Sequence, residues 1–163
     1  MSNHSKAKSI ARGIKLLILD VDGVLTDGGI YFDDNGTEHK KFDSQDGCGI
    51  KLLELCGVEV AIITARSTLS VAHRLETLGV KNYYHGIKDK GKALKELSEK
   101  LSIDLSESAF VGDDVIDLPA MSKVALPIAV ANAHSFVKEN ALMVTEKAGG
   151  SGAVREVCDF LLK

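Results

Sequence analysis

The chain contains no tryptophan, and aromatic residues make up only 5% of its 163 residues. So few aromatic rings leave little surface on which nucleic-acid bases could stack. The formal net charge is −3, so the chain also lacks the excess of positive charge that binds nucleic acids or anionic membranes. We therefore expect a protein that binds neither nucleic acid nor a membrane surface.

Cysteine is also scarce. Cys48, Cys56 and Cys158 are odd in number and are never spaced as a C-x-x-C pair, so we expect free thiols in a reducing compartment. No apolar run approaches the roughly 20 residues that a membrane-spanning helix needs. The polar start of the chain lacks the apolar core of a secretion signal. We expect a soluble protein of the cytoplasm, with a disordered segment at residues 1–13.

Aliphatic runs alternate with segments of helical periodicity over residues 14–163. Such alternation is typical of βαβ units, in which helices connect parallel strands. It predicts the α/β class, with a doubly wound, mainly parallel, Rossmann-like sheet in a single catalytic domain. Strands are predicted at residues 14–19, 58–63, 82–84, 109–111, 125–130 and 142–144.

One segment, at about residues 29–43, departs from this alternation. Its Asn35-Gly36 pair lies between two short extended stretches and is a strong signal for a β-hairpin turn. The hairpin carries apolar side chains, among them Ile30 and Phe32, and would have unpaired edges if it stood alone. We expect it to project from the domain and to contact neighbouring copies of the chain. A hairpin folded back onto its own sheet is the alternative.

Acidic residues follow two of the predicted strands. The first strand ends in Asp20 and Asp22, and a later strand is followed by Asp113, Asp114 and Asp117. Parallel strands end at one edge of a sheet, where ligands bind in such folds, so these carboxylates are expected to converge. Their mutual repulsion has to be offset by a divalent cation, a lysine or a shared proton. The sequence therefore predicts a site for a hard cation such as Mg²⁺.

A hydroxyl and an ammonium group complete this set. Thr64 ends the strand at 58–63, and Lys90 begins a predicted helix. Both groups suit a phosphoryl group, so the inventory fits phosphoryl transfer to a carboxylate. No Gly-x-x-x-x-Gly-Lys-Ser/Thr loop is present, which argues against an enzyme that hydrolyses nucleoside triphosphates. Taken singly, Asp114 and Asp117 could instead cap a helix, and Lys90 could belong to a solvated, lysine-rich face.

These motifs together are similar to those of a known family. They are Asp-Val-Asp-Gly-Val-Leu-Thr-Asp from Asp20, the strand-end Thr64, Lys90, and Gly-Asp-Asp-x-x-Asp ending at Asp117. As a set they resemble the haloacid dehalogenase superfamily of phosphatases. Within it, Thr64-Ala65-Arg66 and the glycine-rich stretch at 148–156 resemble the enzymes that act on 3-deoxy-D-manno-octulosonate 8-phosphate (KDO 8-phosphate).

The resemblance implies a hydrolase that converts KDO 8-phosphate to KDO and phosphate with Mg²⁺, in lipopolysaccharide biosynthesis. It implies that Asp20 is the nucleophile that becomes a phosphoaspartate, and that Asp22 is the general acid and then the general base. Mg²⁺ would be bound by Asp20, Asp113 and the backbone carbonyl of Asp22. Asp114 and Asp117 would support this metal site.

The resemblance also implies the groups that bind the substrate. Thr64 and Lys90 would hold the transferring phosphoryl group, and Arg66 would contact the sugar-acid end of the substrate. Asp46 and Gly47, in a segment similar to that of these enzymes, are expected beside the substrate. The intervals between the motifs are too short for a cap domain. The resemblance therefore implies a homotetramer in which the hairpins of neighbouring copies cover the site.

Two alternatives stay open. A phosphatase of a nine-carbon sialic-acid-type 9-phosphate has the same chemistry, but such relatives tend to carry Glu where this chain has Arg66. A phosphoryl-accepting receiver domain also combines a doubly wound sheet with an acidic pocket, a threonine and a lysine. Asp22 argues against the receiver, because a general acid two residues from the nucleophile promotes turnover.

Overall fold

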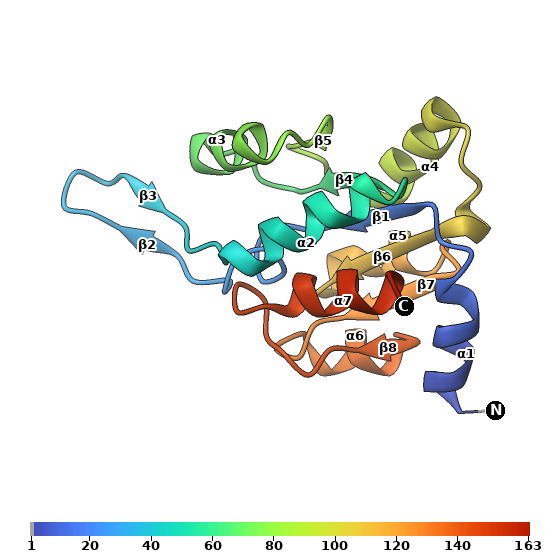
Figure 1. Cartoon of the computed structure of the whole chain (residues 1–163). Coiled ribbons are helices and arrows are strands. Elements are labelled where there is room, and N and C mark those ends of the chain that lie inside the picture. Colours follow the sequence, from blue (N-terminus) through green and yellow to red (C-terminus); the bar gives the residue numbers. More distant parts are fainter. Residues whose placement is uncertain (1) are drawn as a thin grey trace.

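The centre of the molecule is a six-stranded sheet with helices on both faces (Figure 1). The computed structural model describes residues 2–163. The strand order is β5-β4-β1-β6-β7-β8, and every neighbouring pair is parallel, which confirms the predicted doubly wound α/β sheet. The strands are β1 (Leu16–Leu19), β4 (Glu59–Ile63), β5 (Asn82–Tyr84), β6 (Ser108–Gly112), β7 (Leu126–Ala129) and β8 (Met143–Val144).

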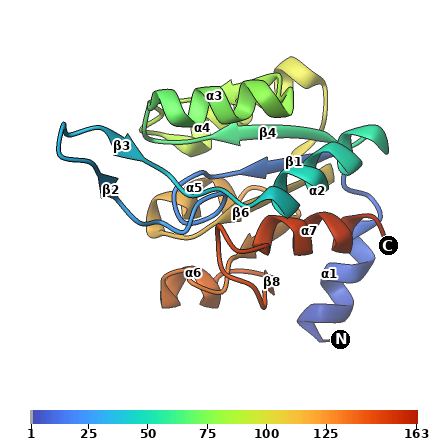
Figure 2. The same ribbon diagram turned by 60° about the vertical axis from the view of Figure 1, so that its left-hand side comes forward.

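Helices cover the sheet from both sides, which explains why β1 is aliphatic at every position. All four of its side chains are fully buried, as expected for a central parallel strand. Helices α2 and α7 pack side by side on one face, and α4 packs against α5 on the other (Figures 1 and 2). The helices after β1 are α2 (Ser44–Leu55), α3 (Leu69–Leu78), α4 (Lys90–Leu101), α5 (Leu118–Met121), α6 (Ser135–Glu139) and α7 (Ala153–Leu161).

Strands β2 (Tyr31–Phe32) and β3 (Glu38–His39) form the predicted hairpin as a separate antiparallel sheet. It extends away from the body of the molecule, so the alternative in which it folds back onto the central sheet is wrong (Figure 2). Ile30 and Phe32 are each 63% exposed. A bridge between Thr26 and Phe42 closes the base of the hairpin, next to the end of β1.

The start of the chain corrects one prediction. Residues Asn3–Ala11 form helix α1, capped by the Ser2 hydroxyl, where disorder was predicted over 1–13. The helix lies against α7, β7 and β8, and it buries Ala7 and Ala11. Two small apolar residues one turn apart make too narrow a stripe to recognise in a polar segment. Met1, part of the predicted segment, lies outside the described residues.

Helix α2 begins at Ser44, in a polar first turn that precedes its buried apolar residues Ile50 and Leu53. Asp43 precedes the helix in an extended conformation, and its carboxylate accepts hydrogen bonds from the N–H groups of Gln45 and Asp46. This cap stabilises a polar first turn that lacks apolar periodicity.

None of the helices in residues 2–163 combines the length and the apolar character that a membrane crossing requires.

Candidate active site

A pocket lies beyond the carboxyl ends of β1, β4 and β6, the three central strands of the sheet. This edge is where open α/β sheets bind their ligands. The structure therefore brings together residues that are as many as 96 positions apart in the sequence, from Asp20 to Ile116. The pocket is lined by Asp20, Asp22, Thr64, Ala65, Arg66, Asp113, Asp114 and Ile116.

Lys90 lies beneath this pocket, between two carboxylates. Its Nζ is 2.8 Å from Oδ1 of Asp20 and 2.6 Å from Oδ1 of Asp117, and its side chain is 1% exposed. Burial alone would lower the pKa of Lys90, but the two carboxylates outweigh this effect and the pKa is raised. Lys90 is therefore a buried ammonium group, and the alternative of a solvated lysine is wrong.

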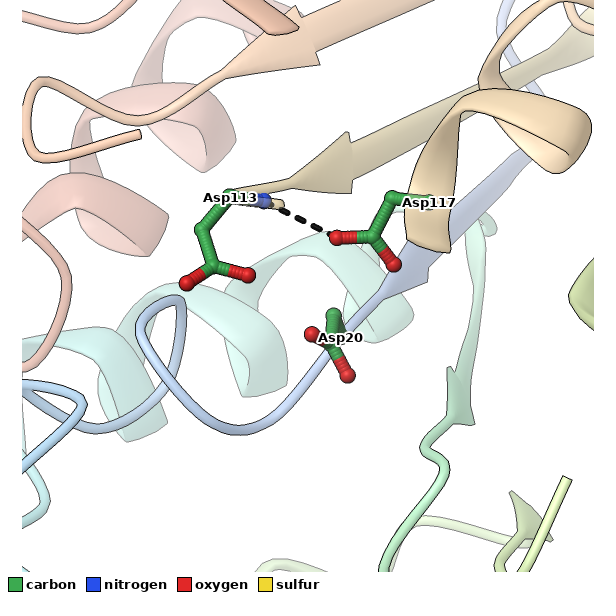
Figure 3. A group of neighbouring side chains, drawn as sticks. All are labelled: Asp20, Asp113 and Asp117. Carbon is green, nitrogen blue, oxygen red and sulfur yellow. Dashed lines mark hydrogen bonds between the residues drawn. The ribbon is translucent and has the colours of Figure 1, made fainter. Parts of the chain in front are cut away.

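Asp117 organises the loop that follows β6. Its Oδ2 accepts the backbone N–H groups of Asp113, at 3.0 Å, and Asp114, at 3.3 Å; Figure 3 shows the first of these bonds. Because Lys90 already contacts Oδ1, both oxygens of Asp117 are engaged. Asp114 and Asp117 also form a capping box on the 3₁₀ turn Val115–Asp117, so the capping alternative is confirmed and coexists with their place at the site.

Three carboxylates are close enough to share one ion. One oxygen from each of Asp20, Asp113 and Asp117 lies within 4.8 Å of the others (Figure 3). Since the oxygens of Asp117 are engaged, Asp20 and Asp113 are the better direct ligands. Gly23 fits this arrangement, because its backbone has a φ of +81° and a Cβ there would lie 2.0 Å from Oδ2 of Asp113. Hard oxygen donors of this kind fit Mg²⁺.

The charges of this cluster are poorly compensated by the protein alone. Burial, followed by the charges of Asp20 and Asp117, raises the pKa of Asp113 to about 8. Burial and the charge of Asp117 raise the pKa of Asp20 to about 6, although Lys90 opposes the shift. A divalent cation would relieve this repulsion, which supports the metal site predicted from the sequence.

Thr64 and Arg66 reach the pocket from the end of β4. Thr64 is buried, and its Oγ1 accepts the backbone N–H of Arg66 at 3.4 Å. The Arg66 guanidinium is 43% exposed and donates from Nη2 to Oε2 of Glu38, at 2.8 Å. Both residues therefore line the pocket that holds the acidic cluster.

Asp46 and Gly47 do not line this pocket. Asp46 is 1% exposed, and its Oδ1 accepts the backbone N–H of Arg155, at 2.8 Å, near the start of α7. Burial raises the pKa of Asp46 to about 6. A Cβ at Gly47 would meet the Arg74 guanidinium at 2.5 Å, so this glycine allows close packing of α2 against α3. The first turn of α2 faces other helices, which the sequence motif alone could not show.

Two charged residues of the hairpin segment, Lys40 and Glu38, also lie at the site, although the sequence did not point to them. The Lys40 ammonium contacts the Asp22 carboxylate and is 3.1 Å from Oε1 of Glu38, and its side chain is 1% exposed. Glu38 in turn binds Arg66. Lys40 and Lys41 are adjacent in a polar segment that follows β3, so no signal in the sequence distinguishes the buried lysine from the exposed one.

Asn132, after β7, was also missed. Its Nδ2 donates to the carbonyl of Gly23, at 3.1 Å, and its Oδ1 accepts the N–H of Gly149, at 2.7 Å. A Cβ at Gly149 would lie 1.8 Å from the same carbonyl oxygen of Gly23. The glycine-rich loop before α7 therefore packs behind the loop that carries Asp22.

Comparisons with known proteins agree with this geometry. A family model described as haloacid dehalogenase-like hydrolase matches residues 84–157. The 3-deoxy-D-manno-octulosonate 8-phosphate phosphatase KdsC of Salmonella typhi is 51% identical over 162 residues, which cover 99% of this chain and 85% of that relative. Both matches are to hydrolases, so the alternative of a phosphoryl-accepting receiver domain is wrong.

Solved structures are similar over nearly the whole chain. The phosphatase of the same name from Yersinia pestis has 44% identity and a TM-score of 0.94, covering 96% of this chain and 85% of that one. The Moraxella catarrhalis phosphatase, solved in complex with magnesium ion, phosphate ion and KDO, has 42% identity and a TM-score of 0.94, covering 97% and 91%. By sequence, fold and the arrangement of its acidic strand ends, this chain belongs to the haloacid dehalogenase-like hydrolases.

Proposed function

We propose that this chain is a Mg²⁺-dependent phosphomonoesterase that hydrolyses KDO 8-phosphate to KDO and inorganic phosphate in lipopolysaccharide biosynthesis. The observation that carries the proposal is the buried Asp20 carboxylate, which lies beside Lys90 and Asp113 at the mouth of the central strands. The chain is also 51% identical, over almost its whole length, to the phosphatase KdsC of Salmonella typhi, and this similarity supports the same substrate.

In the first step Asp20 is the nucleophile. A carboxylate oxygen of Asp20 attacks phosphorus while the bond between phosphorus and the sugar oxygen breaks, and the contact with Lys90 holds the carboxylate in place. Asp22 donates a proton to the departing sugar oxygen. Thr64 and Lys90 donate hydrogen bonds to the phosphoryl oxygens, which gain charge in the transition state.

In the second step water hydrolyses the phosphoaspartate. Asp22, now ionised, accepts a proton from the water as its oxygen attacks phosphorus, and the bond from phosphorus to Asp20 breaks. This returns both carboxyl groups to their starting states and releases inorganic phosphate. The position of Asp22 in the pocket, with its side chain 29% exposed, suits a group that meets both the sugar and water.

Asp20, Asp113 and the backbone carbonyl of Asp22 would hold Mg²⁺, with Asp114 and Asp117 as support. When bound, Mg²⁺ offsets phosphate charge and so allows an anionic nucleophile to approach an anionic substrate. Arg66 would bind the carboxylate of the sugar acid, since a guanidinium matches a carboxylate in shape and charge.

The proposed assembly is a homotetramer in the cytoplasm. The exposure of Ile30 and Phe32 on a projecting hairpin supports contacts between copies, because such side chains on an unpaired edge favour association. The free thiols of Cys48, Cys56 and Cys158 suit a reducing compartment.

Phosphate release from KDO 8-phosphate, with Mg²⁺ and with a chelator, tests the proposed function. We expect release with Mg²⁺ and none with chelator, and loss of at least about a thousandfold in the Asp20→Asn variant, whose amide cannot form the acyl phosphate. Faster release from sialic-acid-type 9-phosphates than from KDO 8-phosphate would overturn the proposed substrate while keeping the mechanism.

A further inference from the structure

Lys40 stands out among the residues of the hairpin, because its side chain is 1% exposed on an element that otherwise projects into solvent. The side chain of its neighbour His39 is 62% exposed, and Lys41 is also exposed. Lysine side chains are rarely so fully buried unless they are paired. The ammonium of Lys40 must therefore be held by specific partners.

Those partners are two carboxylates. The ammonium contacts Oδ1 of Asp22 on one side and lies 3.1 Å from Oε1 of Glu38 on the other. The second oxygen of Glu38 accepts a hydrogen bond from Arg66. Asp22, Lys40, Glu38 and Arg66 thus form a continuous row of alternating charge from the loop after β1, through the hairpin, to the loop after β4.

This row bears on the orientation of Asp22. Asp22 lies on a loop, and its side chain is 29% exposed, so it needs a partner to stay in one rotamer. The contact with Lys40 engages Oδ1 and leaves Oδ2 for the sugar oxygen and the attacking water. Catalysis by a general acid depends on such orientation, because the proton has to be held within hydrogen-bond reach of the reacting oxygen.

We propose that Lys40 is a positioning residue for the acid and base function of Asp22, and that Glu38 bridges Lys40 and Arg66 and so keeps both side chains in place. The hairpin is then part of its own subunit's active site, in addition to any contact it makes with neighbouring copies. This inference rests on the proposed phosphatase function, because it assigns Lys40 a task in that reaction.

The Lys40→Met variant keeps most of the side-chain length and removes the charge. We expect kcat for KDO 8-phosphate to fall by about tenfold to a hundredfold, with KM changed less than about threefold, because orientation of Asp22 matters for the chemical steps. The matched control is Lys41→Met, which removes the adjacent exposed lysine and is expected to leave both constants unchanged. A higher KM with unchanged kcat would overturn the proposal, since Lys40 would then be a substrate contact.

A series of aryl phosphates tests the role of Lys40 without depending on which sugar phosphate is the substrate. Phosphate esters with weakly acidic leaving groups need protonation by Asp22, whereas 4-nitrophenyl phosphate does not. We therefore expect the Lys40→Met variant to lose about tenfold or more on the poorest leaving groups and little in the single-turnover release of 4-nitrophenol. An equal loss across the series would overturn the role of Lys40. Wild-type protein that cleaves aryl phosphates but not KDO 8-phosphate would refute the proposed substrate and leave this test intact.

Two further variants guard against misfolding. Lys40→Arg retains a cationic donor and is expected to keep more than about a tenth of the wild-type kcat. Lys40→Ala leaves space for a small cation, and added methylammonium should restore part of its kcat while leaving Lys41→Ala unaffected. If neither the arginine nor methylammonium restores activity in a variant that unfolds at the wild-type temperature, the proposal is wrong.

Discussion

Gly23 and Asp113 lie against each other, so that a methyl group on Gly23 would come within 2.0 Å of Oδ2 of Asp113. We expect Gly23→Ala to displace this carboxylate and to weaken Mg²⁺ binding by more than about tenfold, because a ligand held out of position loses much of its affinity. Titration of Mg²⁺ into the protein, followed by calorimetry, measures this effect.

Gly36 offers a matched control for that substitution. Its φ of +77° is close to that of Gly23, but nothing lies within 4 Å of a Cβ built there. Gly36→Ala therefore introduces only backbone strain. We expect it to lower the free energy of unfolding by about 1 kcal/mol and to leave the affinity for Mg²⁺ unchanged. Equal Mg²⁺ affinities in the two variants would contradict the assignment of Asp113 as a ligand.

Removal of Mg²⁺ should make stability depend on pH in a specific direction. The pKa values of Asp20, about 6, and Asp113, about 8, lie above the ordinary value of 3.8. Between the ordinary and the raised pKa values the folded chain binds more protons than the unfolded chain. The contribution of these groups to the free energy of unfolding therefore falls as pH rises from about 4 to about 8.

Mg²⁺ replaces the protons that hold this cluster together. We expect its dissociation constant to fall with rising pH, and the increase in Tm on adding Mg²⁺ to be larger at about pH 8 than at about pH 5. Thermal unfolding with Mg²⁺ and with chelator at both pH values measures this. The Asp113→Asn variant should lose most of the difference, and a larger increase at the lower pH would refute a site built on these carboxylates.

The sequence predicted the catalytic edge of the sheet better than its surroundings. Asp20 and Thr64 follow buried aliphatic strands whose ends are set by burial on both faces, so their placement follows from the strand pattern alone. The pairing of Lys90 with Asp117 depends on how α4 packs near the loop after β6, which no local pattern encodes. The burial of Lys40 likewise depends on how the chain leaving the hairpin passes Asp22.

Asp46 shows the limit of the motif, because the carboxylate that it places beside the substrate packs between helices in this subunit. Its carboxylate accepts the N–H of Arg155, and its Oδ2 has no hydrogen-bond partner among the residues that the structure describes. Asp46→Ala should lower the free energy of unfolding by about 1–3 kcal/mol, because it leaves that N–H without an acceptor. Urea unfolding measures the loss.

Enzyme kinetics of the same position distinguish packing from substrate binding. If Asp46 only joins α2 to α7, KM for KDO 8-phosphate stays within about twofold of the wild type in Asp46→Asn, which keeps an acceptor oxygen. Burial raises the pKa of this carboxyl, so the neutral amide also avoids burying a charge above about pH 6. A KM raised by tenfold or more would restore the substrate contact predicted from the sequence.

The hairpin provides the test of assembly. Phe32 lies in β2 of the hairpin and is 63% exposed. The proposed tetramer would bury its ring between copies of the chain. A buried phenylalanine contributes about 1.5–3 kcal/mol, so Phe32→Ser should shift the protein to dimers or monomers at micromolar concentration in light scattering. Leu55→Ser is the control, because Leu55 is 83% exposed at the last position of α2, the end farther from the hairpin, and its loss should leave the mass unchanged. A wild-type protein that is monomeric at these concentrations would exclude the tetramer. Hydrolysis of small aryl phosphates by a monomeric Phe32→Ser variant would show that the chemistry needs only one subunit.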